Sequence, residues 1–221
     1  FRECSQLTSV IVPASVKEFG DGVFADCDLV KVWCIRNSAA HTYAINNGLM
    51  FDFLVLVSSV ALDASSCTLN SGANNQLTAT VLPANAYDKS VSWKSSNTTV
   101  ATVSSTGLVT AKAAGQATVT CTTQDGSGKL ATCAVTVKPA APTNLKAASA
   151  SYNSIKISWN AVSGVSGYAV YRYNSSTKKY ERIKTTTSTT YTNTSLTTGT
   201  TYSYKVLAYK TVDGTNIYSA A

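Results

Sequence analysis

The sequence is poor in the residues from which most active sites are built. Its 221 residues include one histidine, His41, and only 11 acidic residues. No serine, aspartate or cysteine accompanies His41 in a nucleophile pattern such as Gly-X-Ser-X-Gly. The acidic residues are too scattered to pair as the acid and base of a glycosidase. The sequence therefore predicts a protein that is not an enzyme.

Metal-binding patterns are missing as well. None of the six cysteines lies at the Cys-X-X-Cys spacing of zinc and redox sites. The stretch Asp125-Gly-Ser-Gly128 lacks the further carboxylates that would complete a calcium site, so we expect a hairpin turn there. We expect no bound metal and no cofactor.

Long apolar runs are absent too. No window of about 18 apolar residues occurs, so we expect no membrane insertion within these residues. The sequence opens at Phe1 without a methionine and stops at Ala221 without a sorting-type tail, which suggests a piece of a longer protein.

The net charge of +7 is concentrated in the last third of the sequence. Residues 139–221 hold nine basic and two acidic residues, whereas residues 1–56 hold four basic and six acidic ones. The basic residues are scattered among strand-like segments, with no basic run and no recognition helix. We therefore expect no nucleic acid as partner.

The first segment contains an internal repeat. A period in the low twenties is typical of solenoids whose unit is one short strand and a turn. At an offset of 23 residues the sequence aligns five apolar pairs, which are Phe1 with Phe24, Cys4 with Cys27, Leu7 with Val30, Val10 with Trp33 and Val12 with Ile35.

The second copy then gives way to a short predicted helix. Ser38 is the expected N-cap and Gly48 the residue just after the helix. The runs Leu7–Cys27 and Asn37–Ala44 resemble the BspA-like leucine-rich repeats of bacterial surface proteins and their terminal unit. The resemblance implies that residues 1–56 are the end and cap of a repeat array whose upstream repeats take part in adhesion.

The same resemblance argues against a zinc site in this segment. Cys27, Cys34 and His41 follow one another at intervals of seven residues. The resemblance places Cys27 in the repeat core and Cys34 on the following strand. We therefore expect no metal there.

From Val60 onward, short runs alternate between apolar and polar residues, with turns between them. About seven such runs before Val137 predict a β-sandwich. Motifs such as Val91-Ser-Trp93 and Gly115-Gln-Ala-Thr-Val119 resemble the group 2 bacterial immunoglobulin-like domain, and the resemblance covers residues 57–138. Trp93 would fill the space between the two sheets as a structural residue.

Two cysteines of this domain flank a predicted hairpin. Cys121 and Cys133 are symmetric about Ser127, which would place them opposite each other and allow a cross-strand disulfide. Two buried thiols are the alternative. A bridge from Cys67 to either of them is also open, because spacing alone cannot decide connectivity.

A third module follows the joint Lys138-Pro-Ala-Ala-Pro142. The runs Ile155-Lys-Ile157-Ser-Trp159 and Leu196-Thr-Thr-Gly199-Thr-Thr-Tyr202 resemble a fibronectin type III domain over residues 139–221, with its last strand missing or incomplete. The resemblance gives Trp159 and Tyr202 structural roles, with Tyr202 at the tyrosine-corner position, where its hydroxyl reaches the backbone.

An aromatic stripe is the best candidate for binding in this module. If Tyr168 and Val170 face the core, alternation turns Tyr171 and Tyr173 outward, and Tyr209 joins them from a neighbouring strand. Such a face could contact a glycan or a protein. Ordinary cross-strand stabilisation is the other interpretation, and the favoured one.

Together these patterns predict a mainly β chain, with the cap of a leucine-rich-repeat solenoid followed by two immunoglobulin-like sandwiches in tandem. The predicted function is that of a non-catalytic, monomeric fragment of a secreted protein at the cell surface or cell wall of a bacterium. Its sandwiches would form a stalk that presents adhesive repeats to a host or microbial surface protein or glycan. A carbohydrate- or matrix-binding module and the accessory tail of a secreted enzyme are the alternatives.

Overall fold

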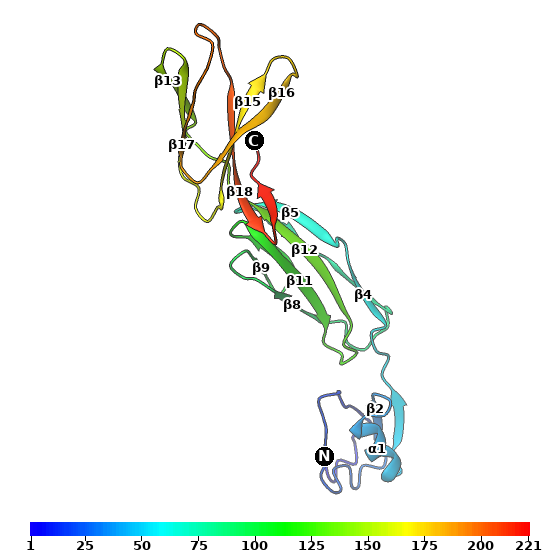
Figure 1. Cartoon of the computed structure of the whole chain (residues 1–221). Helices are drawn as coiled ribbons and strands as arrows, with labels where there is room; N and C mark the ends of the chain where they lie inside the picture. Colours follow the sequence, from blue (N-terminus) through cyan, green and yellow to red (C-terminus); the bar gives the residue numbers. More distant parts are fainter. The chain divides into compact units, whose positions relative to one another are not determined.

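The computed structural model describes residues 1–221, and its regular secondary structure consists of β-strands and one short helix (Figure 1). The predicted mainly β class is confirmed. Its helix, α1 (Ala39–Asn46), is eight residues long, and the structure has no helix with the length and apolar character needed to cross a membrane.

The N-terminal segment, residues 1–55, holds a small parallel sheet. Its strand order is β1-β2-β3, with α1 inserted in the chain between β2 and β3. The Ser38 side chain accepts a hydrogen bond of 3.3 Å from the His41 N–H, so the predicted N-cap is confirmed. The strands are β1 (Ser9–Ile11), β2 (Lys31–Cys34) and β3 (Met50–Phe53).

One turn occurs twice in this segment. The Cys4 N–H donates to the Phe1 carbonyl at 3.3 Å, and the Cys27 N–H donates to the Phe24 carbonyl at 3.2 Å. The rings of Phe1 and Phe24 stack with their centroids 5.6 Å apart. At these residues the predicted offset of 23 is seen in the structure.

The strands that follow the turns pair at an offset of 22 instead. Val10 lies beside Val32, so the predicted alignment of Val10 with Trp33 is wrong by one residue. The alignment of Val12 with Ile35 shifts with it. The second copy has one residue fewer between turn and strand. Because side chains alternate along a strand, the shift puts Val32 in the core and leaves Trp33 partly exposed.

The core of the N-terminal segment gathers the apolar residues of the turns, the strands and α1. Each unit is too small to bury its own apolar face, so the units cover one another. Its buried members are Val12, Phe24, Cys27, Val30, Val32, Cys34, Ala40 and Ala44.

The first sandwich contains nine strands, all of them short except the last two. Its sheets have the orders β5-β12-β11-β8, β6-β10-β9 and β4-β7. The first strand of the four-stranded sheet, β5, runs parallel to β12, whereas β10 is antiparallel to both of its neighbours. The strands are β4 (Ser59–Leu62), β5 (Ser66–Asn70), β6 (Asn74–Gln76), β7 (Ala79–Leu82), β8 (Val91–Ser95), β9 (Ala101–Val103), β10 (Leu108–Ala111), β11 (Gly115–Thr123) and β12 (Leu130–Lys138).

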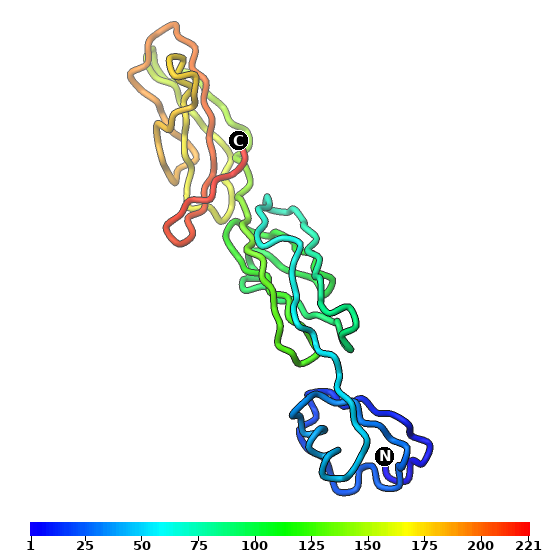
Figure 2. Tube along the Cα trace, turned by 90° about the vertical axis from the view of Figure 1, so that its right-hand side faces the viewer, coloured from blue at the N-terminus to red at the C-terminus, as the bar shows by residue number.

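The second sandwich has two sheets, with orders β13-β14-β17 and β16-β15-β18-β19, and Figure 2 traces its chain from yellow-green to red. Its core contains Ile157, Trp159, Tyr168, Val170, Val206 and Ala208. The strands are β13 (Lys146–Ser151), β14 (Ser154–Ser158), β15 (Gly167–Asn174), β16 (Lys179–Thr186), β17 (Thr190–Asn193), β18 (Tyr204–Val212) and β19 (Thr215–Tyr218).

Candidate functional site

The structure shows no cluster of three or more His, Cys, Asp or Glu side chains that could hold a metal ion. The histidine is engaged in packing. The His41 ring lies edge-on to Phe51 and Phe53, with centroids 4.9 and 5.0 Å away, and its Nδ1 accepts a hydrogen bond from the Asn37 N–H at 3.2 Å.

The most distinctive surface is the outer side of the sheet β16-β15-β18-β19. Tyr168 and Val170 belong to the core of the sandwich, so Tyr171 and Tyr173, which alternate with them on β15, face the other side of the sheet. Antiparallel pairing adds residues from the three neighbouring strands. We call this set the tyrosine face, and it consists of Tyr171, Tyr173, Tyr180, Arg182, Lys205, Tyr209 and Tyr218.

The centre of the tyrosine face is a row of three residues across three strands. Tyr171 of β15 pairs with Arg182 of β16 on one side and with Lys205 of β18 on the other. The Lys205 ammonium lies 5.2 Å from the centroid of the Tyr171 ring and 5.1 Å from that of Tyr180. Both distances lie within the range of a cation–π contact.

The two ends of the face are pairs of tyrosines. Tyr173 and Tyr180 pair across β15 and β16 with centroids 5.4 Å apart, and both side chains are 40% exposed. Tyr209 and Tyr218 pair across β18 and β19 with centroids 5.8 Å apart. The face thus presents aromatic rings from four strands.

Gly167 lets one of these rings lie against the sheet. A Cβ atom at Gly167 would stand 2.8 Å from the Tyr209 hydroxyl oxygen and 2.9 Å from the Thr186 carbonyl oxygen. Both distances are shorter than real Cβ contacts, so the close approach of Tyr209 requires glycine at this position.

Two parts of the chain match known domain families. Residues 56–135 match the family model of the bacterial Ig-like domain (group 2), and residues 140–219 match that of the fibronectin type III domain. The chain carries these two domains in tandem. Both families are non-catalytic Ig-like modules typical of extracellular proteins, and no catalytic domain is found in the chain.

Similar proteins include enzymes in which the matching part is small. A kappa-carrageenase of Pseudoalteromonas carrageenovora is 47% identical over 34% of this chain and 19% of its own length. An alpha-L-arabinofuranosidase of Bifidobacterium longum is 42% identical over 42% of this chain and 9% of its own length. A crystal structure of an Fn3-like protein from Clostridium thermocellum is 41% identical, with a TM-score of 0.32, over 37% of this chain and 86% of that one.

The aromatic residues predicted to be structural differ in burial. Trp159 of the fibronectin type III domain is buried and meets Tyr168 edge-on at 5.4 Å, and its Nε1 has no hydrogen-bond partner. Trp93 of the Ig-like domain lies on β8 and is partly exposed. The Tyr202 hydroxyl accepts a hydrogen bond of 3.0 Å from the Thr197 N–H, the backbone contact expected of a tyrosine corner.

The cysteines considered for a disulfide lie on the four-stranded sheet of the Ig-like domain. Cys121 on β11 and Cys133 on β12 are both fully buried, and burial raises the pKa of the Cys121 thiol. Cys67 of β5 lies beside Val135 of β12 and is partly exposed. Pairing of Cys121 with Cys133 stays a prediction.

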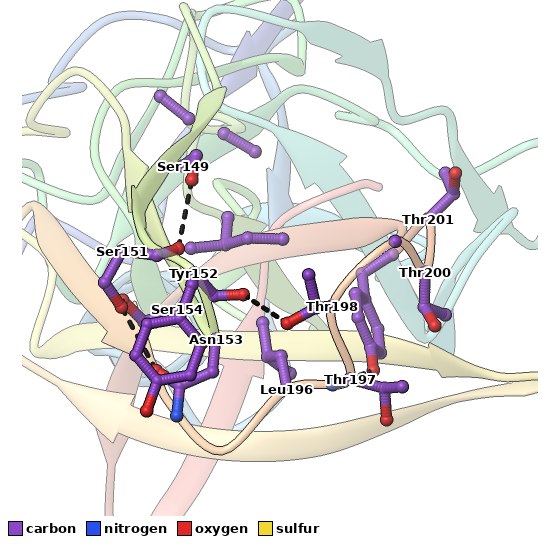
Figure 3. Close-up of a pocket in the computed structure, with 15 residues that line it drawn as sticks. Ser149, Ser151, Tyr152, Asn153, Ser154, Leu196, Thr197, Thr198, Thr200 and Thr201 are labelled. Carbon is purple, nitrogen blue, oxygen red and sulfur yellow. Dashed lines mark hydrogen bonds between the residues drawn. The ribbon is translucent and has the colours of Figure 1, made fainter.

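A groove of about 330 Å³ lies at one end of the fibronectin type III domain, between the turn after β13 and the loop before β18 (Figure 3). Its polar groups bond to one another: the Thr198 hydroxyl donates to the Tyr152 carbonyl at 2.8 Å, and the Ser151 and Ser154 hydroxyls are 2.6 Å apart. It also borders β13, an exposed edge strand that pairs with β14 alone. We therefore interpret the groove as the open edge of a sheet.

The sequence predicted three members of the tyrosine face, Tyr171, Tyr173 and Tyr209, and missed others. Tyr180 could have been found, because a hairpin centred between residues 176 and 177 places it opposite Tyr173. Arg182 could have been found in the same way, because the same hairpin register places it opposite Tyr171, and the β-bulge in β16 lies beyond this pair.

Proposed function

We propose that this chain is a non-catalytic accessory region of a secreted bacterial protein, in which two sandwich domains act as a spacer. The tandem of an Ig-like and a fibronectin type III domain carries this proposal. The join between them is short, because β12 ends at Lys138 and β13 begins at Lys146, and it includes Pro139 and Pro142. Proline restricts the backbone and stiffens such a joint.

The relatives support an accessory role in particular. The matching parts of the carrageenase and the arabinofuranosidase are less than a fifth of each protein. A module that recurs as a small part of different larger proteins is expected to serve the whole protein and not to carry out the reaction. Their activities and substrates belong to those enzymes.

In the finer form of this proposal, the spacer is a stalk for adhesive leucine-rich repeats at the cell surface or wall. The N-terminal segment supports this form. Its turn recurs after 23 residues and its strands stack in parallel, as in solenoids with one strand for each repeat. Upstream repeats would then contact a surface protein or glycan.

The spacer proposal is tested by a distance measurement on the full chain. Fluorescent labels at the exposed Glu18 and Thr198, introduced as unnatural amino acids, report the distribution of distances between the ends. A spacer gives a narrow distribution that broadens when Pro139 and Pro142 are both replaced by glycine. A distribution as broad as that of a flexible linker in the native sequence would overturn the proposal.

A second candidate function is binding through the tyrosine face. It is favoured by the two exposed rings of Tyr173 and Tyr180 and by the aromatic rows beside them. Tyrosine supplies contact area and a polar tip at low cost in side-chain entropy. Screening the chain against glycan and matrix-protein arrays tests this function. If replacing Tyr171, Tyr173 and Tyr209 with alanine leaves the binding unchanged, the assignment is wrong.

A further inference from the structure

Two cations on the tyrosine face lack acidic partners. The structure contains a single salt bridge, between Lys31 and Asp52 in the N-terminal segment. Arg182 and Lys205 therefore stand on the face without a carboxylate to neutralise them. An uncompensated pair of cations among aromatic rings is the chemistry of a site for an anion.

The protein holds both cationic groups by contacts that leave their charge intact. The Lys205 ammonium lies over the rings of Tyr171 and Tyr180, and Arg182 Nη1 donates a hydrogen bond of 3.3 Å to the Tyr218 hydroxyl. These contacts orient the cations without neutralising them. The face is therefore partly organised before any ligand arrives.

The spacing of the two cations follows from the sheet. Tyr171 is the register neighbour of both Arg182 and Lys205, so the cations lie two strands apart on one surface. Adjacent strands are about 4.8 Å apart, which places the two backbones roughly 10 Å from each other. The Lys205 ammonium reaches Tyr180 of β16 and Arg182 Nη1 reaches Tyr218 of β19, so the two side chains extend across the four strands. An extended chain that carries several anionic groups suits such a surface.

The acidic residues of the domain do not oppose such a ligand. Only Glu181 and Asp213 lie within residues 139–221. The Glu181 carboxylate accepts hydrogen bonds from the Asn174 side-chain amide at 3.0 Å and the Thr177 hydroxyl at 2.8 Å, next to the hairpin turn. Asp213 lies in the turn between β18 and β19, so no carboxylate belongs to the tyrosine face.

We propose that the tyrosine face binds an anionic polysaccharide. Its sulfate or carboxylate groups meet Arg182 and Lys205, and its sugar rings lie against the exposed rings of Tyr173 and Tyr180. This inference rests on the second candidate function above and names its ligand class. A polysaccharide fits better than DNA, which carries one negative charge for about every 1.7 Å of its axis and calls for a denser row of cations.

Binding of the full chain to three forms of one polymer tests this proposal. The probes are dextran sulfate, carboxymethyl dextran and unmodified dextran, which share a backbone and differ in charge. We expect saturable binding of at least one charged form and none of unmodified dextran. Equal binding of all three forms, or binding of none of them, would overturn the anionic class.

Matched variants separate the site from general charge attraction. The double variant Arg182→Gln and Lys205→Gln should bind about tenfold more weakly, because its two charged contacts are lost. The control, Lys146→Gln with Lys156→Gln, removes the same charge from β13 and β14 of the other sheet. An equal loss of affinity in the two double variants would show that binding reflects general charge attraction and would overturn the proposed site.

Two further measurements complete the test. Replacing Tyr173 and Tyr180 with alanine should also weaken binding, and unchanged affinity would contradict the stacking of sugar rings. Equal affinity for polyglutamate or single-stranded DNA would overturn the preference for a polysaccharide. The spacer proposal is tested separately, because the distance measurement involves no ligand. Failure of the binding experiments would therefore not count against it.

Discussion

The backbone N–H of Val57 donates a hydrogen bond of 2.6 Å to the buried carboxylate of Asp125, 68 residues away in the sequence. Asp125 lies in the hairpin between β11 and β12, and Val57 lies where the chain enters the Ig-like domain. The Ser127 N–H and hydroxyl donate to the other carboxylate oxygen at 3.0 and 2.6 Å. This carboxylate therefore fastens the start of the domain to a distant turn.

Replacing Asp125 with alanine should lower the stability of the Ig-like domain. The change leaves the buried Val57 N–H without its acceptor, and an unsatisfied buried donor costs about 1 to 3 kcal/mol. Urea unfolding followed by tryptophan fluorescence measures the loss. Asp63→Ala is the control, because its carboxylate also accepts a backbone N–H, that of Thr78, but is exposed. An equal loss in both variants would mean that the burial of Asp125 is unimportant.

Asp125 should also make the free energy of unfolding of the Ig-like domain depend on pH. Burial alone would raise the pKa of its carboxyl, but hydrogen bonds from Ser127, Val57 and Thr123 together hold that pKa below its ordinary value. A lowered pKa stabilises the folded state above the unfolded pKa of about 3.9, and this contribution is lost as pH falls through the folded value. Unfolding free energies of native protein and Asp125→Asn, measured from pH 7 to pH 2, should converge as the pH falls. A difference that stays constant would contradict this assignment.

Gly167→Ala should destabilise the fibronectin type III domain. The added methyl group would overlap the Tyr209 hydroxyl and the Thr186 carbonyl, and such overpacking costs about 1 to 3 kcal/mol. Thermal unfolding measures the effect. Adding Tyr209→Phe removes one of the two clashing atoms, so the double variant should recover part of the loss. If Gly167→Ala is as stable as the native domain, Tyr209 does not lie across β15 as the structure has it.

A disulfide between Cys121 and Cys133 would show itself by mass spectrometry. If the bridge forms under oxidising conditions, iodoacetamide should modify only four of the six cysteines in the unfolded, unreduced protein. Reduction should then lower stability by about 2 to 3 kcal/mol, because the bridge closes a short loop. Modification of all six cysteines before reduction would show that no bridge forms. If only four are modified, peptide mapping would show whether Cys67 takes part in the bridge in place of Cys121 or Cys133.

Local features were largely readable from the sequence. Alternation of apolar and polar residues predicted the mainly β class, and Ser38 marked the start of the helix. These signals depend on neighbours a few residues apart. The outward direction of Tyr171 and Tyr173 belongs to the same group, because it follows from the two-residue period of a strand.

The register in which the strands pair was harder to predict from the sequence. The self-alignment at 23 residues placed the turns correctly but put Val10 beside Trp33, whereas the strands pair Val10 with Val32. One residue fewer after the second turn causes the shift. A self-alignment at a single offset cannot represent the loss of one residue between the two copies. That loss reverses which side chain of the strand faces the core.

The β-rich character of the chain, its helix cap and the motifs of two sandwich domains could be read from the amino-acid sequence, because these are local patterns of side-chain size and polarity. The burial of Asp125 against Val57 and the pairing of Tyr171 with Lys205 came from the tertiary structure instead. Both relationships depend on which strands become neighbours. Pairing between distant segments sets both, so no short stretch of sequence contains them.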